Sequence, residues 1–225
     1  MIQFLILYVL GGERIVKTYL TVGTDLIKRD LFRKVQNSSN TDTVKPSGGL
    51  WLTEFNINYP NYNSWVDYIL NYNYILFYKN KEINPFIQPC SVVSLKEDAS
   101  IFYLTDLKQY NFLVRAYGNG KDFINFEKLV EYYDGIYIDL SSLRRDLSSE
   151  QLKLLLNFSL NTLLLFNLDC IDYYYAGKVK IDEFDYTDIY INGFINYEIN
   201  WDSSKKYIDD NTNFKKLVKK RMKED

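Results

Sequence analysis

The sequence predicts a single α+β domain, and three observations lead to this fold class. Short segments rich in β-branched and aromatic residues alternate with segments of helical periodicity, without the regular strand–helix–strand order of a parallel α/β fold. The length of 225 residues suits one large domain. No internal repeat, linker or break in composition occurs before about residue 203. We therefore expect one domain over 1–203 and a basic C-terminal helix or tail over 204–225.

The first third of the chain predicts two strands and two helices. "RIVKTYLTV" (14–22) and "GLWLTEF" (49–55) have strand composition. "DLIKRDLFRKV" (25–35) predicts a helix, because apolar residues at 26, 27 and 31 lie opposite a basic face. The polar turn formers of 36–47 predict a loop. "NSWVDYIL" (63–70) predicts a short helix that begins after an Asn or Ser cap.

The middle of the chain contains the clearest helical pattern. "DFINFEKLVEYYDG" (122–135) has an apolar stripe, a capping aspartate at its start and Asp-Gly at its end. "PCSVVSLK" (89–96) and "SIFYL" (100–104) before it, and "IYIDL" (136–140) after it, predict strands.

The last third predicts one helix, two strands and the tail. "SSEQLKLLLNF" (148–158) predicts a helix, with Ser148 and Gln151 spaced for a capping box. "DYYYAGKVKI" (172–181) and "DIYINGFINYEI" (188–199) predict strands.

The composition excludes several classes of chemistry. The chain has no histidine, which removes Ser-His-Asp and Cys-His catalysis and histidine metal ligation. The two cysteines form no motif, so a reducing compartment is expected. No acidic calcium-loop motif is present, and we expect no metal. The net charge of -2 argues against an extended nucleic-acid-binding surface.

The N-terminal apolar run is too short to cross a bilayer. "MIQFLILYVL" has about nine apolar residues, whereas a spanning helix needs ~20. It lacks a basic leader and a small-residue cleavage site, so it is better interpreted as a buried strand or an extension on the core. We expect a cytoplasmic protein without membrane association.

The stretch "KPSGGLWLTEFN" (45–56) collects proline, glycine and tryptophan, residues that are rare elsewhere in the chain. Gly48 and Gly49 allow a ligand to approach the main chain closely, and strand alternation places Trp51 and Thr53 on one face. This arrangement would suit a flat heterocycle. The alternative interpretation, which the frequency of buried tryptophans favours, is a loop-to-strand turn with Trp51 in the core.

Two further segments carry weaker signals. "YLTVGTDL" (19–26) ends a strand with a glycine between threonines, which often marks only a bulge or turn. In "EYYDGIYIDL" (131–140), strand alternation places Tyr137 and Asp139 on one face, where they line either a cleft or a solvated edge.

Taken in chain order, these three segments resemble the layout of the mono-ADP-ribosyltransferase superfamily. "TVGT", the glycine-tryptophan strand and the later strand with an acid match its three cofactor-contacting strands. "KPSGGLW", followed by "SWVDYI", "YDGIYI" and "LDCIDYYY", is also similar to a set of small uncharacterised bacterial and phage proteins. The resemblance covers roughly residues 19–176 and implies two small, mostly antiparallel sheets with flanking helices.

The resemblance also implies a site and an activity. NAD, as substrate, would lie in a cleft, with an aromatic ring against the nicotinamide and glycine backbone against its amide or the phosphates. The implied cofactor-binding residues are Thr21, Gly23, Thr24, Gly48, Gly49, Trp51 and Tyr137. Asp139 would stabilise the positive charge that develops on the ribose, and Thr53 would support it by hydrogen bonding.

This sequence departs from the superfamily pattern at two points. Residues 21–24 contain no Arg and the chain has no His, and the expected glutamate is replaced by Asp139. Either Asp139 is a shorter replacement, or the acid is Glu54 or Asp169, or the fold persists without the activity.

The expected function is therefore ADP-ribosyl transfer to a protein or nucleic acid, as in a toxin or a phage–host conflict factor. The alternative is a non-catalytic protein that binds and inhibits a phage or host macromolecule. A nucleic-acid-binding module that uses the basic tail and the tyrosines is a third alternative, but a solvated terminal helix is the favoured interpretation of that tail.

Overall fold

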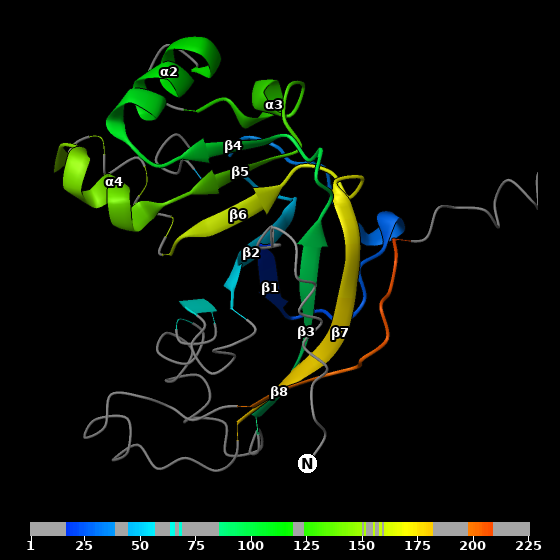
Figure 1. The fold of residues 1–225 in the computed structure, drawn as a ribbon. Coiled ribbons are helices and arrows are strands. Elements are labelled where there is room, and N and C mark those ends of the chain that lie inside the picture. The colour runs from blue at the N-terminus through cyan, green and yellow to red at the C-terminus, as the bar shows by residue number, and fades with distance from the viewer. Residues whose placement is uncertain are drawn as a thin grey trace, which may run out of the picture.

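The computed structural model describes residues 17–38, 45–56, 64–65, 68, 86–118, 124–149, 151, 155, 158, 160–181 and 198–208. Its strands form one sheet in the order β4-β5-β6-β2-β1-β3-β7-β8 (Figure 1). The pair β4–β5 is parallel and every other neighbouring pair is antiparallel. The strands are β1 (Thr18–Val22), β2 (Leu50–Phe55), β3 (Phe86–Leu95), β4 (Ile101–Leu104), β5 (Gly135–Ile138), β6 (Thr162–Leu165), β7 (Ile171–Ile181) and β8 (Glu198–Trp201).

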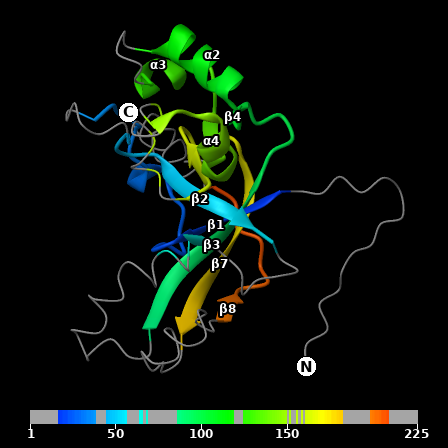
Figure 2. The ribbon, with the colours of Figure 1, turned by 90° about the vertical axis from the view of Figure 1, so that its left-hand side faces the viewer.

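The α+β class is confirmed, but the described strands form one sheet where two were expected. Strand β2 is the physical reason, because its two ends pair with different neighbours. Residues 50–52 pair with β6 and residues 53–55 pair with β1, so the ladder continues from one half of the sheet to the other. The two halves run in clearly different directions (Figures 1 and 2).

Three helices lie on one side of the β4–β5–β6 half of the sheet (Figure 1). They are α2 (Leu107–Tyr117), α3 (Phe126–Leu129) and α4 (Leu140–Asp146). Between them and the sheet lies the first apolar core, which we call the helix-side core. Its members include Val35, Phe102, Leu113, Phe126, Ile136, Leu143, Phe158 and Leu164.

The opposite face of the same strands forms a second core, the inner core, together with β1, β3 and β7. It includes Tyr19, Leu52, Val93, Tyr137, Leu163, Leu165, Ile171 and Tyr174. These residues come from both halves of the sheet, so the inner core holds the two halves together. A third, smaller core lies on the other face of the β1–β3–β7 half and includes Leu20, Phe55, Cys90, Val92 and Val179.

The strand predictions are largely confirmed. Strands occur where 14–22, 49–55, 89–96, 100–104 and 172–181 predict them. The capping box is also present: Ser148 N donates to Gln151 Oε1 at 3.0 Å, and Gln151 N donates to Ser148 Oγ at 3.3 Å.

The helix predicted over 25–35 is wrong. Only a 3-10 turn, η1 (Arg29–Leu31), forms there, and the rest of the segment is irregular. The apolar residues of this segment lie in different environments. Ile27 belongs to the inner core, Val35 belongs to the helix-side core, and Leu31 is exposed. Of the three apolar residues on which the prediction rested, Leu26 and Leu31 are exposed and Ile27 is buried, so they share no buried helical face.

The helix predicted over 122–135 is much shorter in the structure. α3 contains four residues, and Asn125 caps it by accepting from Lys128 N. Asn37 fixes this start as well, because Asn37 Oδ1 accepts from Phe126 N at 2.7 Å. After α3 the chain turns so that β5 can begin at Gly135.

Three elements were not predicted. α2 has a sequence signal, since Asp106 caps it through Gln109 N and Tyr110 and Leu113 repeat at helical spacing on its buried side. α4 begins inside the segment predicted as strand 136–140. β6 is a short apolar run, a pattern that periodicity cannot assign to strand or helix.

Some predictions lie partly or wholly outside the described residues. The start of the chain, most of 63–70, residues 188–197 and the tail from 209 onward belong to these segments. Where the tail is described, Lys206 exchanges two backbone hydrogen bonds with Tyr174 of β7, and Ile208 packs against the inner core. None of the helices in the described part of the chain is both long and apolar enough to cross a membrane.

Candidate functional site

The three segments of the expected site lie within four neighbouring strands. β1 and β2 are adjacent, and β6 separates β2 from β5. The predicted residues nevertheless lie on different faces of these strands and do not form one cluster.

Trp51 and Thr53 lie on the face that was expected, opposite Leu50 and Leu52. Trp51 packs against the helix-side core, 5.8 Å from the ring of Phe158, and its Nε1 donates to Gly48 O at 3.0 Å. Lys45 Nζ lies 4.5 Å from the centroid of the indole. Thr53 is 1% exposed. This segment is therefore a loop-to-strand turn with Trp51 packed against the core, as the alternative interpretation of the sequence predicted.

Gly48 and Gly49 have positive φ values of 77° and 70°. A Cβ on Gly48 would lie 2.3 Å from Lys34 O, and one on Gly49 would lie 2.4 Å from Leu164 Cδ1. The need for glycine here comes from packing of the chain against itself.

The "TVGT" segment continues β1 into a turn. Thr21 is buried, Gly23 N donates to Pro89 O at 2.7 Å, and Thr24 Oγ1 donates to Leu26 O at 2.9 Å. Thr24, Gly48 and Gly49 come together as part of the lining of a small hollow of about 310 Å³. Thr21, Gly23, Trp51 and Thr53 are not among the described residues that line it.

Asp139 does not lie in the strand as expected, because β5 ends at Ile138 and Asp139 caps α4. Its Oδ1 accepts from Ser142 N at 3.0 Å and its Oδ2 accepts from Ser142 Oγ at 2.8 Å. Both carboxylate oxygens are thus engaged in starting the helix.

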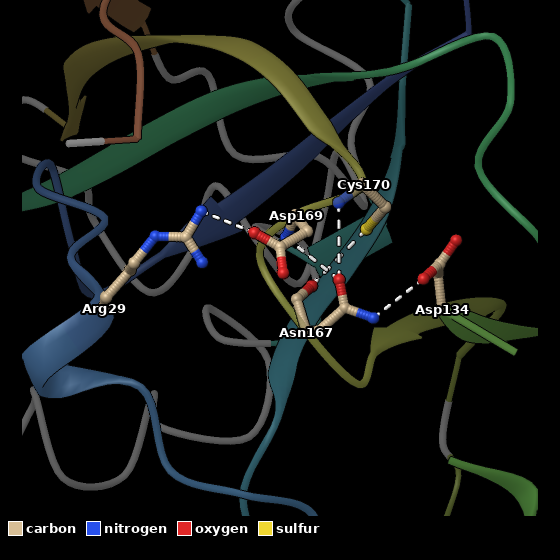
Figure 3. A network of polar contacts seen from close by, with 5 residues as sticks. All are labelled: Arg29, Asp134, Asn167, Asp169 and Cys170. Carbon is tan, nitrogen blue, oxygen red and sulfur yellow. Dashed lines mark hydrogen bonds and ion pairs between the residues drawn. The ribbon is translucent and has the colours of Figure 1, made fainter. Parts of the chain in front are cut away.

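Asp169 belongs to a turn between β6 and β7 and pairs with Arg29 (Figure 3). Asn167 organises this turn: its Oδ1 accepts from Asp169 N and Cys170 N, and its Nδ2 donates to Asp134 Oδ1 at 2.8 Å. The Asp134 carboxylate also accepts from Ser100 N. The segments "YDGIYI" and "LDCIDYYY" are therefore joined by a structural network.

A different cluster of polar side chains forms on the inner face of the sheet. It consists of Lys17, Tyr19, Glu54, Tyr103 and Tyr137, and we call it the tyrosine–glutamate cluster. Tyr19 lies opposite Glu54 in the β1–β2 register, and Tyr103 lies opposite Tyr137 in the β4–β5 register. One pair comes from each half of the bent sheet, so the bend brings the two pairs together.

Distances confirm that the cluster is compact. Lys17 Nζ lies 3.7 Å from Glu54 Oε1, 5.3 Å from the Tyr103 ring centroid and 5.9 Å from that of Tyr137. The centroids of Tyr103 and Tyr137 are 5.7 Å apart. Tyr19 and Tyr137 are buried, whereas the side chains of Lys17 and Glu54 are 57% and 52% exposed. The two tyrosines thus form the buried part of the cluster, and the Glu54 carboxylate is accessible to solvent.

Burial and negative charge raise the pKa values of the two buried tyrosines. For Tyr137 the causes are desolvation, then the charges of Glu54 and Asp139, and a hydrogen bond with Glu54, while a hydrogen bond with Asn161 acts in the opposite direction. For Tyr19 they are desolvation, then Tyr103, Glu54 and Tyr137. Both hydroxyls remain protonated at neutral pH and act as hydrogen-bond donors rather than bases.

A larger hollow of about 600 Å³ borders this cluster. Lys17, Tyr19 and Tyr103 belong to both, and Tyr173 adds another aromatic ring. The hollow also has charged residues of both signs in its lining, namely Lys96, Glu97, Asp98 and Asp172. Its volume lies within the range of small-molecule sites.

Most of this cluster was missed by sequence analysis. Glu54 was named as an alternative acid and Tyr137 as a cofactor-binding residue, but Lys17, Tyr19 and Tyr103 were not considered. Alternation places Lys17 and Tyr19 on one face of β1. The strand order that brings β4 and β5 close to Lys17 and Tyr19 depends on contacts between distant segments, which no local sequence pattern encodes.

Within the described part of the chain, no group of three or more His, Cys, Asp or Glu residues could hold a metal ion. Comparisons with models of protein families, with curated proteins and with solved structures each found no match.

Proposed function

We propose that this protein binds NAD in the larger hollow and transfers ADP-ribose to a macromolecule, with Glu54 as the acid. The observation that carries the proposal is the position of the Glu54 carboxylate. The carboxylate is half exposed and lies beside Lys17 and Tyr137. Its ion-pair partner Lys17 and its register partner Tyr19 line a hollow of about 600 Å³. The acceptor would be a protein or nucleic acid of a phage or its host.

The choice of Glu54 over Asp139 follows from their hydrogen bonds. Asp139 uses both oxygens to cap α4. A carboxylate held in this way is directed at the helix backbone and at Ser142. Glu54 lies on β2 opposite Tyr19, and Tyr19 lines the hollow. Glutamate is also the acid expected from the superfamily resemblance.

The lining of the hollow suits the two charged parts of NAD. The nicotinamide ring carries a positive charge, which aromatic faces and carboxylates stabilise. The described lining provides both through Tyr19, Tyr103, Tyr173 and three acidic residues. The pyrophosphate is negative, and the lining contains Lys17 and Lys96. Both halves of the bent sheet contribute to this lining, with Tyr19 from β1 and Tyr103 from β4.

The reaction would break the bond between nicotinamide and ribose C1′. Nicotinamide leaves with the electron pair of that bond as a neutral molecule, and positive charge develops on the ribose. The Glu54 carboxylate stabilises this charge, as acids do in glycoside hydrolysis. A nucleophile of the acceptor then forms the new bond to C1′ and loses its proton.

The test compares NAD binding and nicotinamide release in the wild type and in Glu54→Gln. A group that acts mainly in the transition state lowers the rate and leaves affinity nearly unchanged. We expect the release rate to fall roughly a hundredfold or more, and the calorimetric affinity for NAD to change little. Cell lysate supplies acceptors in the assay.

Glu198→Gln is the matched control, because it makes the same change at an exposed position of the edge strand β8. It should retain the wild-type rate. If wild type neither binds NAD at millimolar concentration nor releases nicotinamide, the proposal is wrong. If Glu54→Gln retains full activity, another group is the acid.

A second candidate function is non-catalytic binding of another macromolecule. A set of neighbouring aromatic side chains on α2 and on the segment after α3 favours this function. Phe112 is 51% exposed and Tyr132 is 59% exposed, and Tyr117 contacts both rings. Exposed apolar patches often mark interaction surfaces. Failure of the NAD test, together with recovery of a specific protein that Phe112→Ser no longer binds, would favour this function.

A further inference from the structure

We propose that the smaller hollow is a second site, which binds a medium-length alkyl carboxylate. It has a volume of about 310 Å³ and shares no described lining residue with the larger hollow. The inference therefore stands independently of NAD and of the tyrosine–glutamate cluster.

The wall of this hollow is mainly aliphatic and aromatic. Ile27 and Leu168 form its buried part, and Leu50 and Phe32 are partly buried beside them. Leu31 is 67% exposed and also lines the hollow, so apolar surface extends to its opening. Such a wall favours a ligand with a hydrocarbon chain.

Two residues in the lining of the hollow are glycines that have no room for a side chain. Gly48 and Gly49 line it, and each would collide with neighbouring atoms if it carried a Cβ. The space that their side chains would need is occupied by neighbouring residues, so both contribute only main chain to the lining. Gly49 N donates to Arg33 O at 2.8 Å, so two of the lining residues are hydrogen-bonded to each other.

The charge in the lining has one sign. Lys28 and Arg33 are the charged residues among the described residues that line the hollow, and none of those residues is acidic. The hydroxyl of Thr24 is engaged locally, since it donates to Leu26 O and accepts from Leu26 N. An anionic headgroup is therefore the polar group that this lining stabilises most, whereas the two cations would repel an amine.

The volume limits the length of the chain. Small-molecule sites start at about 300 Å³, so this hollow suits a chain of medium length and not a long one. We take octanoate as the probe, with hexanoate as the shorter acid and octanol as the neutral molecule of equal chain length.

Titrations followed by calorimetry and by methyl NMR of the full chain test the proposal. Each buried methylene contributes about a fourfold gain in affinity, so octanoate should bind about 15-fold more tightly than hexanoate. The methyl signals of Leu31 and Leu50 should shift on binding. Leu31→Ala changes an exposed wall residue and should weaken octanoate binding, whereas Ile87→Ala, which is 46% exposed on β3, should not.

A pair of double variants tests the charge. Lys28→Gln with Arg33→Gln should weaken octanoate binding roughly tenfold and leave octanol binding unchanged, because only the acid interacts with the cations. Lys108→Gln with Arg115→Gln, on α2, removes the same charges from exposed positions elsewhere and should have no effect. All these side chains are exposed at least in part, so the variants should fold; circular dichroism checks this.

Three results would overturn the proposal. The first is the absence of saturable octanoate binding up to about 10 mM. The second is equal affinities for hexanoate and octanoate, and the third is equal effects of the two double variants. The last result would show non-specific attraction to net positive charge.

Discussion

Gly49 shows how a residue that suggests a ligand site can serve the fold. Its φ is 70°, and a Cβ would lie 2.4 Å from Leu164 Cδ1 and 2.8 Å from Leu165 O. It stands at the start of β2, against β6 and the segment that contains Val35. The sequence identified this position as special, and close packing of the chain is the reason.

We expect Gly49→Ala to lower the free energy of unfolding by about 2–5 kcal/mol. Positive φ costs an alanine about 1–2 kcal/mol, and the steric conflict with β6 adds about 1–3 kcal/mol. Gly23→Ala is the control, because Gly23 also has positive φ but a Cβ there meets nothing within 4 Å. It should cost only the conformational part. Urea denaturation measures both, and equal losses would contradict the packing argument.

At the scale of elements, the caps decide where helices begin. Asp106, Asn125 and Asp139 each accept from a backbone N–H in the first turn of α2, α3 and α4. Asp139 is the most informative of the three, since it was expected to be the catalytic acid. The end of β5 and the start of α4 share this residue, so its role depends on where the strand stops.

Asp139→Ala should lower stability by about 0.5–2 kcal/mol, as the loss of a cap does. Because the proposed acid is Glu54, nicotinamide release by the folded variant should remain within a few-fold of wild type. Asp146→Ala, at the exposed last residue of α4, is the control for stability. A hundredfold loss of activity with unchanged stability would instead assign Asp139 to catalysis.

At the scale of the whole molecule, two cysteine thiols and two tyrosine hydroxyls with raised pKa values lie in two of the three cores. Burial raises the pKa of Cys90 to about 12, and burial with nearby Asp134 raises that of Cys170 to about 12. The pKa values of Tyr19 and Tyr137 are raised as well, mainly by burial. In the unfolded chain all four groups would ionise at lower pH.

This difference predicts that stability falls as the pH rises from about 9 to 12. In that range the unfolded state releases protons that the native state keeps, so the slope of unfolding free energy against pH is negative. Urea midpoints measured across the range test this. Tyr137→Phe should reduce the slope, and Tyr207→Phe, at an exposed position, should leave it unchanged. A flat profile for wild type would show that these groups are not buried in solution.

Some features of this protein were determined by the sequence alone. Strand alternation placed Trp51 and Thr53 opposite Leu50 and Leu52, and the Ser148–Gln151 spacing identified a capping box. Strand composition located most of the strands that the structure describes. These features depend on backbone geometry and on neighbours close in the chain, which a sequence displays directly.

Only the tertiary structure decided the sheet and the candidate site. Residues 25–35 carry a helical spacing, but Ile27 and Val35 enter different cores, so burial overrode the local preference. The Tyr19–Glu54 pair and the Tyr103–Tyr137 pair meet because the sheet bends at β2, which pairs with β6 at one end and with β1 at the other. Contacts between residues so distant in the chain depend on how the sheet closes, and no local pattern records that geometry.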